Sequence, residues 1–367
     1  MKILLSGGGT GGHVYPALAL MRRIQEVDPT AEFLYVGTEK GLESRIVKDY
    51  NIPFAAVKIQ GFKRSISFDT LKTIQLFINS IKQAKKIVKD FQPDVVIGTG
   101  GYVCAPVVYA ASKLKIPSII HEQNSVAGVT NKFLARYVTK IAVCFEEAKM
   151  EFSKYPEKVC FTGNPRAQEV STVQKKAALE AYNLDSEKPT VLIFGGSRGA
   201  KKINDAFIEA LPELVTKNYQ VLMATGDIHF DTIKSQLAKM ANDKFNVSVV
   251  SYIPNMPEVF STVSLVVSRS GATTLAELTA LGLPSVLIPS PYVTNDHQTK
   301  NAESLVNKHA ALLIKEPELT GKRLIQTLDE LMMNPTKRHE MAKNAKKIGM
   351  PFASDRLIDV INEIVGK

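Results

Sequence analysis

The turn at residues 268–271 carries the residues best suited to binding a charged ligand. It reads Ser-Arg-Ser-Gly, follows an apolar segment, and leads into a helix-like segment that opens with Ala272, Thr273 and Thr274. Unpaired backbone N–H groups at a helix N-terminus attract anions, so this turn predicts a phosphate site. Glu277 falls in the second helical turn, where its carboxylate could accept two hydrogen bonds from a ribose or sugar diol. These residues indicate a nucleotide-like ligand, although an ordinary strand-turn-helix unit with a solvent-facing Glu277 also accounts for them.

Three further glycine-rich loops follow predicted strands, at residues 6–13, 98–102 and 195–199. The first contains G-x-G-x-x-G at Gly7, Gly9 and Gly12. Glu39 lies roughly where a dinucleotide fold places its ribose-binding acid, so an NAD-type site is one interpretation. Open α/β sheets bind ligands at the carboxyl ends of their strands, and the four loops suit two diphosphates, one in each half of the chain, better than one dinucleotide. Each loop alone is equally well explained as a tight turn.

Candidate acid-base and sugar-binding residues lie beside these loops. His13 follows the first loop, and a neutral imidazole can take a proton from an alcohol that is becoming a nucleophile. A structural histidine at a helix N-terminus is the rival interpretation. Glu122, within His-Glu-Gln-Asn at 121–124, is another candidate base or hydroxyl ligand. Residues 295–298 read Asn-Asp-His-Gln and fit either hydrogen bonding to sugar hydroxyls or a capped helix start.

The loops require a scaffold of alternating strands and helices, and the sequence predicts one. Short apolar segments separated by helix-period segments are typical of parallel α/β sheets, and here they form two series. The first series of predicted strands is 2–6, 32–36, 55–59, 94–98, 118–121 and 140–143. The second series is 190–194, 219–224, 247–250, 265–268, 285–288 and 311–314. We therefore expect two doubly wound, Rossmann-like domains, at 1–163 and 164–349, with Ser354-Asp355 capping a last helix.

Composition restricts the partners. The chain has 367 residues, and its 46 Lys and Arg exceed its 36 Asp and Glu to give a net charge of +10, which predicts an anionic partner. Cys104, Cys144 and Cys160 are scattered without a C-x-x-C pair, as expected of free thiols in a reducing cytoplasm. The start of the chain lacks the apolar run of a signal peptide, and no window holds the ~18 uninterrupted apolar residues of a spanning helix. We expect a soluble or peripheral protein on the cytoplasmic side.

Residues 61–90 form a basic and apolar stretch. They carry seven Lys or Arg, and Leu71, Ile74, Ile78 and Ile81 form one helical stripe. Apolar residues ringed by cations suit an anionic membrane surface, although a core-facing helix with a solvated rim explains the same pattern. Nucleic-acid binding is not expected, because no aromatic residues interleave the cations.

Several long motifs resemble a known family. In chain order they are GGTGGHVYPALA (8–19), GTGGYVCAP (98–106), HEQN (121–124), GNPR (163–166), GGSRGA (195–200) and SRSGATTLAE (268–277). Together they resemble the MurG family of bacterial glycosyltransferases, which attach N-acetylglucosamine to undecaprenyl-pyrophosphoryl-MurNAc-pentapeptide. The linker reads GNPR where many members read GNPVR.

The resemblance implies a GT-B fold: two Rossmann-like domains with a cleft between them, and a final helix within 350–367 that packs back on the first. It implies UDP-N-acetylglucosamine as the donor, a lipid-linked muramyl-pentapeptide as the acceptor, and a peripheral position on the cell membrane. The donor-binding residues it implies are Thr10, Gly11, Gly12, Asn124, Arg166, Ser197, Ile253, Ala272, Thr273, Thr274, Leu275, Glu277 and Gln298. The acceptor-binding residues it implies are Gly9, Gly100, Gly101, Tyr102 and Glu122.

We expect the reaction to be an inverting displacement without a cofactor. His13 would take the proton of the muramyl 4-hydroxyl, which attacks the anomeric carbon opposite UDP. Helix N-terminal N–H groups at 271–274 would offset the charge gained by departing UDP, so no protein-bound metal is expected. The alternatives are an NAD-dependent oxidoreductase using Gly7 to Gly12 and Glu39, a UDP-sugar epimerase of similar fold, and a non-catalytic nucleotide-sugar-binding protein.

Overall fold

The chain divides into two compact α/β units. The structure, a computed structural model, describes residues 1–60, 69–173, 178–239 and 246–366, with the backbone alone for 69–74. One unit comprises residues 1–168 and 352–367, and the other comprises residues 169–351. The expected boundaries were 163/164 and 349/350, so Arg166, expected in the second domain, lies in the first unit.

The first unit contains a seven-stranded parallel sheet with strand order β3-β2-β1-β4-β5-β6-β7. Its strands are β1 (Lys2–Ser6), β2 (Glu32–Gly37), β3 (Phe54–Ala56), β4 (Val95–Gly98), β5 (Ser118–Glu122), β6 (Lys140–Val143) and β7 (Val159–Phe161). Its helices are α1 (Gly11–Val27), α2 (Leu42–Asp49), α3 (Asp69–Phe91), α4 (Cys104–Lys113), α5 (Val129–Leu134), α6 (Ala148–Glu151), α15 (Ala353–Val365) and the start of α7 (Pro165–Ser171).

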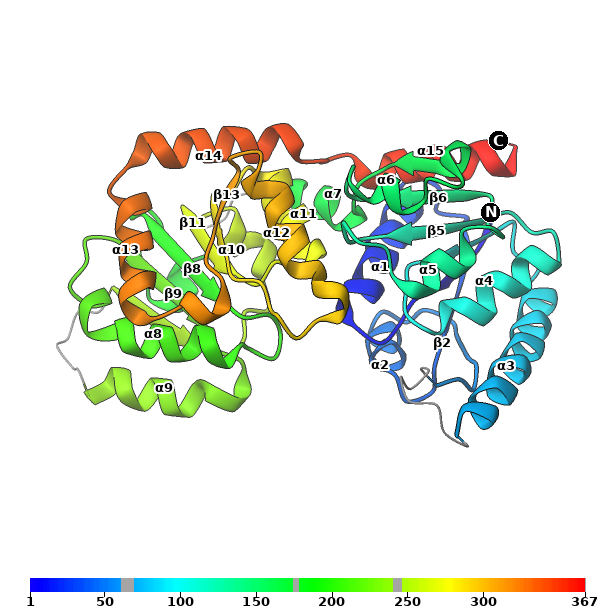
Figure 1. Cartoon of the computed structure of the whole chain (residues 1–367), viewed down its shortest axis with the longest axis horizontal. Coiled ribbons are helices and arrows are strands. Elements are labelled where there is room, and N and C mark those ends of the chain that lie inside the picture. The colour runs from blue at the N-terminus through cyan, green and yellow to red at the C-terminus, as the bar shows by residue number, and fades with distance from the viewer. Residues whose placement is uncertain (61–68, 174–177, 240–245, 367) are drawn as a thin grey trace. The chain divides into compact units, whose positions relative to one another are not determined.

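The second unit contains a six-stranded parallel sheet with strand order β10-β9-β8-β11-β12-β13. Its strands are β8 (Thr190–Phe194), β9 (Gln220–Ala224), β10 (Val247–Val250), β11 (Leu265–Ser268), β12 (Ser285–Leu287) and β13 (Ala311–Leu313). Its helices, all labelled in Figure 1, are α8 (Lys201–Leu214), α9 (Asp227–Lys239), α10 (Met256–Phe260), α11 (Ala272–Leu281), α12 (His297–Val306), α13 (Gly321–Met332) and α14 (Pro335–Ile348).

Both sheets are covered on two faces, as their uninterrupted apolar strands require. On β8, Val191 and Ile193 join a core cluster with α8 and α13, whereas Leu192 and Phe194 join a second cluster with α10 and α11. Successive side chains of a strand point to opposite faces, so one apolar run supplies both layers. This pattern explains why the strand predictions lie so close to the observed strands.

Each sheet reverses its winding direction at one place. In the first unit the reversal lies between β1 and β4, and in the second it lies between β8 and β11. At such a switch point the connections after the two neighbouring strands leave toward opposite faces, so their loops part and leave space for a ligand. The four glycine-rich loops predicted from the sequence follow these four strands.

The C-terminal helix α15 completes the core of the first unit. Leu357 and Ile361 are 1% and 0% exposed and join the cluster that contains Ile3 and Leu18. Asp355 accepts hydrogen bonds from Arg23 Nε at 2.6 Å and from Gln168 Nε2 at 2.8 Å.

The predicted cap of this last helix is wrong. The helix begins at Ala353 after Phe352, and Ser354 instead donates to the Pro165 carbonyl oxygen at 3.3 Å. Here a side chain that is suited to capping makes a tertiary hydrogen bond instead.

Two predicted details of the first unit differ from the structure. The strand expected at 55–59 is β3, Phe54–Ala56, and the chain then leaves the sheet to line a cavity. Helix α3 turns Ser80, Ala84 and Val88 inward, while Ile78 from the predicted stripe is 44% exposed. Residues 61–68, which belong to the basic apolar stretch, lie outside the described residues, as do the side chains of Leu71 and Ile74.

Candidate functional site

The two glycine loops of the first unit interlock at the switch point. The Gly8 amide donates to the Gly100 carbonyl at 3.1 Å, and the Thr99 hydroxyl donates to the His13 carbonyl at 2.7 Å. Gly101 has a φ of +85°, and a Cβ there would stand 2.3 Å from the Gly8 carbonyl oxygen. Glycine is therefore required at 101 both for its backbone conformation and for this close approach.

The hydrogen bonds of His13 fix its tautomer. Nδ1 of this half-buried imidazole lies 2.8 Å from the Gly8 carbonyl oxygen and 3.3 Å from the Thr10 hydroxyl. A carbonyl oxygen only accepts hydrogen bonds, so Nδ1 carries the proton and Nε2 carries the lone pair. The ring packs against Gly100, where a Cβ would stand 2.9 Å from Nε2. Nε2 is therefore the basic atom of this side chain.

A buried carboxylate that the sequence did not single out supports the same loop. Glu43 of α2 is 1% exposed and accepts hydrogen bonds from the Thr38 amide at 2.9 Å, the Thr38 hydroxyl at 2.6 Å and the Gly9 amide at 3.2 Å. A Cβ added at Gly37 would stand 2.6 Å from Glu43 Cγ, and one at Gly41 would stand 2.2 Å from Glu43 Oε1. The sequence signal is a glutamate that follows two nearby glycines, which is too weak to predict a site.

Glu122, predicted to bind the acceptor, organises the loop after β5. Its Oε1 accepts from the amide of Asn124 at 3.1 Å and from its side chain at 3.3 Å. Its Oε2 accepts from the Gly128 amide at 2.9 Å and from Asn131 Nδ2 at 2.8 Å. The carboxylate is 2% exposed, so its direct action in this structure is to hold Asn124, a predicted donor contact, in place.

A neutral histidine lies behind this loop. Gln123 Nε2 donates to His121 Nδ1 at 2.8 Å, so His121 Nε2 carries the proton and donates to the Gly163 carbonyl at 3.0 Å. Burial lowers the pKa of His121 to about 4. Burial also raises the pKa of Cys144, whose Sγ lies 3.4 Å from His121 Nε2, well above its ordinary value. Both groups stay neutral near pH 7 and act structurally.

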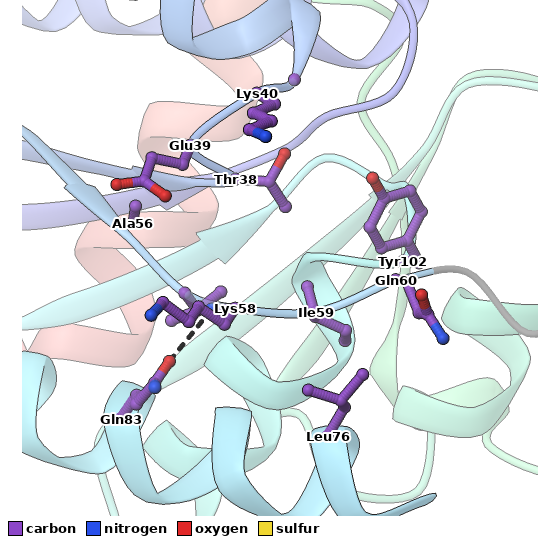
Figure 2. Close-up of a pocket in the computed structure, with 12 residues that line it drawn as sticks. Thr38, Glu39, Lys40, Ala56, Lys58, Ile59, Gln60, Leu76, Gln83 and Tyr102 are labelled. Carbon is purple, nitrogen blue, oxygen red and sulfur yellow. Dashed lines mark hydrogen bonds between the residues drawn. The ribbon is translucent and has the colours of Figure 1, made fainter. Parts of the chain in front are cut away.

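A cavity of about 440 Å³ lies beside the second glycine loop. It is lined by Tyr102 from that loop, by Ile59 and Gln60 after β3, and by Glu39 and Lys40 on the loop after β2 (Figure 2). The Lys58 amide donates to Gln83 Oε1 of α3 at 3.0 Å, which joins two walls of the cavity. Glu39, the residue on which the NAD interpretation depends, is an exposed wall residue here.

The switch point of the second unit pairs a glycine loop with a helix N-terminus. Gly196 and Gly199 have φ of +93° and +73°, and a Cβ at Gly199 would stand 2.0 Å from the Thr225 carbonyl oxygen. The loop therefore packs tightly on the end of β9. Ser197, a predicted phosphate contact, is exposed.

Helix α11 presents its first turn beside this loop. Gly271 is the N-cap with a φ of −66°, and a Cβ there would meet no atom within 4 Å. The first-turn amides belong to Ala272, Thr273 and Thr274, as an anion site requires. The Leu275 amide already donates to the Gly271 carbonyl at 3.0 Å, and its side chain is 1% exposed.

Hydrogen bonds tie α12 to this turn. Ser270 is fully buried and donates to the Gln298 carbonyl at 2.7 Å, and Asn301 Nδ2 donates to the Ser270 carbonyl at 3.2 Å. Gln298 Oε1 accepts the Ser290 amide at 2.9 Å, which fixes the orientation of a predicted sugar contact.

An ion pair holds the same turn against the end of β12. Arg269 pairs with Glu316 and donates to the carbonyl oxygens of Ile288 and Pro289 at 3.1 and 3.2 Å. The two charged side chains are 15% and 10% exposed. The arginine of the Ser-Arg-Ser-Gly motif is thus a structural residue of the turn.

Three further predicted donor contacts are Glu277, Ile253 and Arg166. Glu277 is 7% exposed on α11, and Ile253 is 1% exposed and packs in a core cluster. Only the backbone of Ile253 is therefore suited to a ligand contact. Arg166 places its guanidinium 5.9 Å from the centroid of the Tyr15 ring, within the first unit.

Helices α3, α4 and α5 lie side by side (Figure 1) and carry exposed apolar side chains. Val129, Phe133 and Ile78 are 73%, 40% and 44% exposed. Arg136 and Lys113 lie 4.5 and 5.6 Å from the centroid of the Tyr137 ring beside them.

The described residues contain neither a candidate membrane-spanning helix nor a candidate metal site. No helix in the described ranges combines the length and the apolar character needed to cross a membrane. The same part of the chain holds no group of three or more His, Cys, Asp and Glu side chains that could bind a metal ion.

Two family models match the chain. The glycosyltransferase family 28 N-terminal domain matches residues 3–143, and the family 28 C-terminal domain matches residues 190–357. The chain therefore belongs to glycosyltransferase family 28. The first model covers β1 to β6 of the first unit, and the second covers the sheet of the second unit and the start of α15.

Full-length relatives define the family more closely. The chain is 56% identical over 365 residues to the Listeria monocytogenes (serotype 4a, strain HCC23) UDP-N-acetylglucosamine--N-acetylmuramyl-(pentapeptide) pyrophosphoryl-undecaprenol N-acetylglucosamine transferase, and covers 100% of both chains. The crystal structure of Acinetobacter baumannii MurG matches with a TM-score of 0.76 at 28% identity over 99% of each chain. The predicted resemblance to the MurG family and the predicted GT-B fold are confirmed.

An epimerase shares the fold only. The UDP-GlcNAc 2-epimerase from Neisseria meningitidis, solved with UDP-GlcNAc bound, matches with a TM-score of 0.69 but is 17% identical, over 99% of this chain and 100% of that chain. Such a likeness shows the architecture and gives no support to an epimerase activity.

Proposed function

We propose that this protein transfers N-acetylglucosamine from UDP-N-acetylglucosamine to the 4-hydroxyl of MurNAc in undecaprenyl-pyrophosphoryl-MurNAc-pentapeptide (lipid I). The product is lipid II, a precursor of peptidoglycan. The observation that supports this most strongly is 56% identity over the full length to a transferase named for this reaction. The glycine-lined switch point in each unit agrees with it, since both substrates carry a diphosphate.

In this proposal the second unit binds the donor. The amides of Ala272, Thr273 and Thr274 at the start of α11, together with Ser197, bind the diphosphate. Glu277 binds the ribose, the backbone of Ile253 binds uracil, and Gln298 binds the transferred sugar. The Leu275 amide donates to the Gly271 carbonyl within the helix, so it is not free to bind the ligand. The buried Leu275 side chain supports the first turn instead.

The first unit binds the acceptor and supplies the remaining donor contacts. Gly9 and the loop at Gly100, Gly101 and Tyr102 bind the acceptor diphosphate, and Glu122 acts by holding Asn124. The donor contacts from this unit are Thr10, Gly11, Gly12, Asn124 and Arg166.

His13 is the proposed general base. Its Nε2 takes the proton of the muramyl 4-hydroxyl as that oxygen attacks the anomeric carbon from the face opposite UDP, giving a β-linked disaccharide. The Gly8 carbonyl holds the opposite nitrogen as N–H, so Nε2 keeps its lone pair for the proton. The N-terminal amides of α11 stabilise the charge that develops on departing UDP.

A transfer assay tests this function. The protein is incubated with UDP-N-acetylglucosamine radiolabelled in the sugar and a polyprenyl-pyrophosphoryl-MurNAc-pentapeptide, and labelled lipid is extracted and digested to identify the disaccharide. Labelled lipid with a β-linked GlcNAc-MurNAc unit is expected. If label appears only as free or epimerised sugar, with or without acceptor, the transferase proposal fails and the epimerase alternative gains support.

The exposed apolar side chains of Ile78 on α3 and of Val129 and Phe133 on α5 are the proposed contact with an anionic membrane surface. Exposed apolar side chains flanked by Lys113, Lys132 and Arg136 match the chemistry of an interfacial site, where each cation contributes about 1 kcal/mol. This would place the protein on the cytoplasmic side of the cell membrane, where its lipid-linked substrate resides.

Vesicle sedimentation tests the membrane contact. We expect Val129→Ser with Phe133→Ser to lower partition onto vesicles containing phosphatidylglycerol by at least about 10-fold, because two apolar anchors are lost. Met333→Ser, which removes an exposed apolar side chain from the second unit, is the matched control. Equal partition of the two variants would reject these side chains as the contact.

A further inference from the structure

A chain of hydrogen bonds joins a buried carboxylate to the imidazole of His13 through one peptide group. The Gly8 carbonyl accepts from His13 Nδ1 at 2.8 Å, and the amide of the next residue, Gly9, donates to Glu43 Oε2 at 3.2 Å. These two groups are the two ends of the same planar peptide unit. We propose that Glu43 is a positioning residue that orients and polarises His13 through the Gly8-Gly9 peptide. This inference rests on the proposed function, in which His13 is the base.

The surroundings of Glu43 indicate an ionised acceptor. All three of its hydrogen bonds are donated to it, by two groups of Thr38 and by Gly9, which is how a carboxylate with no proton is satisfied. A Cβ at Gly8 would stand 2.7 Å from its carboxylate, so the loop carries glycine where any side chain would displace this group. The carboxylate therefore fixes the position of the loop by its hydrogen bond with Gly9 and its contact with Gly8.

The polarisation follows from the order of the hydrogen bonds. A negative charge that accepts the Gly9 N–H draws electron density toward the Gly8 oxygen, and this strengthens its hydrogen bond with His13 Nδ1–H. When Nε2 takes a proton, the imidazole becomes a cation and the Gly8 oxygen and Glu43 stabilise it. The carboxylate of a catalytic triad has this effect in direct contact with histidine, and here one peptide group lies between them.

Other titratable groups surround the same loop. Tyr35 of β2 donates to the Gly7 carbonyl at 2.8 Å, and Cys104 of α4 donates to the carbonyl oxygens of Ser6 and Gly100. Burial raises the pKa of Cys104 to about 12 and that of Tyr35 well above its ordinary value, so both stay neutral through the working range. Arg166 of α7 is one cation beside α1, with its guanidinium 5.9 Å from the centroid of the Tyr15 ring.

The test is the pH profile of kcat for Glu43→Gln in the full-length protein. Glutamine keeps the size of the side chain and removes the charge. We expect kcat to fall about 10-fold, and the acidic limb of the profile to move to lower pH by roughly half a unit to one unit, because a removed negative charge disfavours the imidazolium. The KM for UDP-N-acetylglucosamine should change less than about twofold, since a positioning role acts on chemistry.

Two further variants separate this effect from lost stability. Glu43→Asp keeps the charge with one methylene less, and it should return the acidic limb toward its wild-type position. Asp355→Asn removes the charge of a carboxylate that accepts hydrogen bonds from Gln168 and from Arg23, which lies near the other end of α1 from His13, so it should lower thermal stability without moving the limb. If the limb of Glu43→Gln coincides with that of the wild type, or if Gln and Asp lower kcat equally, the inference is overturned. If the wild type itself transfers no sugar, the proposed function fails instead.

Discussion

The two switch points occupy the same topological position in their sheets but use their glycines differently. In the first unit, Gly101 is held in a left-handed conformation with no room for a Cβ beside the Gly8 oxygen. In the second, Gly271 has an ordinary φ and open space where its side chain would be. Glycine in the first is thus required by the protein itself, and in the second it leaves space for a ligand. A substitution at Gly101 should therefore lower the stability of the fold, whereas a substitution at Gly271 should weaken ligand binding.

The largest effect is expected at the base itself. His13→Ala should lower kcat by at least ~10²-fold with the KM for UDP-N-acetylglucosamine largely kept, because a positioned base contributes about 10²- to 10⁴-fold. Steady-state kinetics with the lipid acceptor measure this. His339→Ala, which removes an exposed histidine of α14, is the control and should match the wild type. Unchanged turnover of His13→Ala would reject the assignment of the base.

Gly101→Ala should mainly damage stability. The left-handed φ and the overlap with the Gly8 oxygen together should lower the free energy of unfolding by about 3 kcal/mol. Chemical denaturation followed by circular dichroism measures it. Gly128→Ala is matched, since Gly128 has a φ of −67° and its Cβ would lie 3.8 Å from the nearest atom, so it should cost under about 1 kcal/mol. Equal losses in the free energy of unfolding for Gly101→Ala and Gly128→Ala would contradict the proposed structural requirement for glycine at 101.

The first unit should be sensitive to acid through His121. Its pKa of about 4 lies below the ordinary 6.5, so the neutral form gives stability that is fully present above pH 6.5 and is lost as pH falls toward 4. At pH 4 the loss should be about 3 kcal/mol. Unfolding curves at pH 7.5 and 4.5 for the wild type and His121→Gln measure this. A variant whose pH dependence equals that of the wild type would show that His121 is not the cause.

Gly271→Ala should leave folding almost intact and weaken donor binding. The added methyl meets no protein atom but stands at the proposed diphosphate site, so the KM for UDP-N-acetylglucosamine should rise about 10-fold, or about 1.4 kcal/mol. Gly282→Ala at the other end of α11, where φ is +69°, should do the reverse and lower stability by about 1 kcal/mol with KM unchanged. Equal KM values for the two variants would reject this turn as the binding site of the diphosphate.

The sheets and loops were predictable because fully buried parallel strands read as continuous apolar runs. β1, β8 and β11 have the predicted bounds. The inward face of α3 was not predictable, since Ser80 faces inward and satisfies its hydroxyl on the Phe77 carbonyl, while Ile78 is exposed. Hydrophobicity alone would place Ile78 in the interior and Ser80 on the surface.

The supporting residues of the site could not be read from the sequence. Glu43 resembles any surface glutamate of an amphipathic helix, because its donors come from Thr38 and from a loop 34 residues earlier in the chain. The role of Glu122 as an organiser of its own loop likewise depends on tertiary hydrogen bonds with Gly128 and Asn131. Residue type indicated a functional carboxylate at 122, and only the fold showed what its oxygens contact.

The last helix has a consequence for biosynthesis. Leu357 and Ile361 fill the core of a unit whose first 168 residues are translated earlier, so that unit remains incomplete on the ribosome until α15 has been synthesised. Premature termination shortly before residue 353 would leave the 169–351 unit intact. It would also expose apolar surface on α1, which makes the truncated product a substrate for chaperones and proteases.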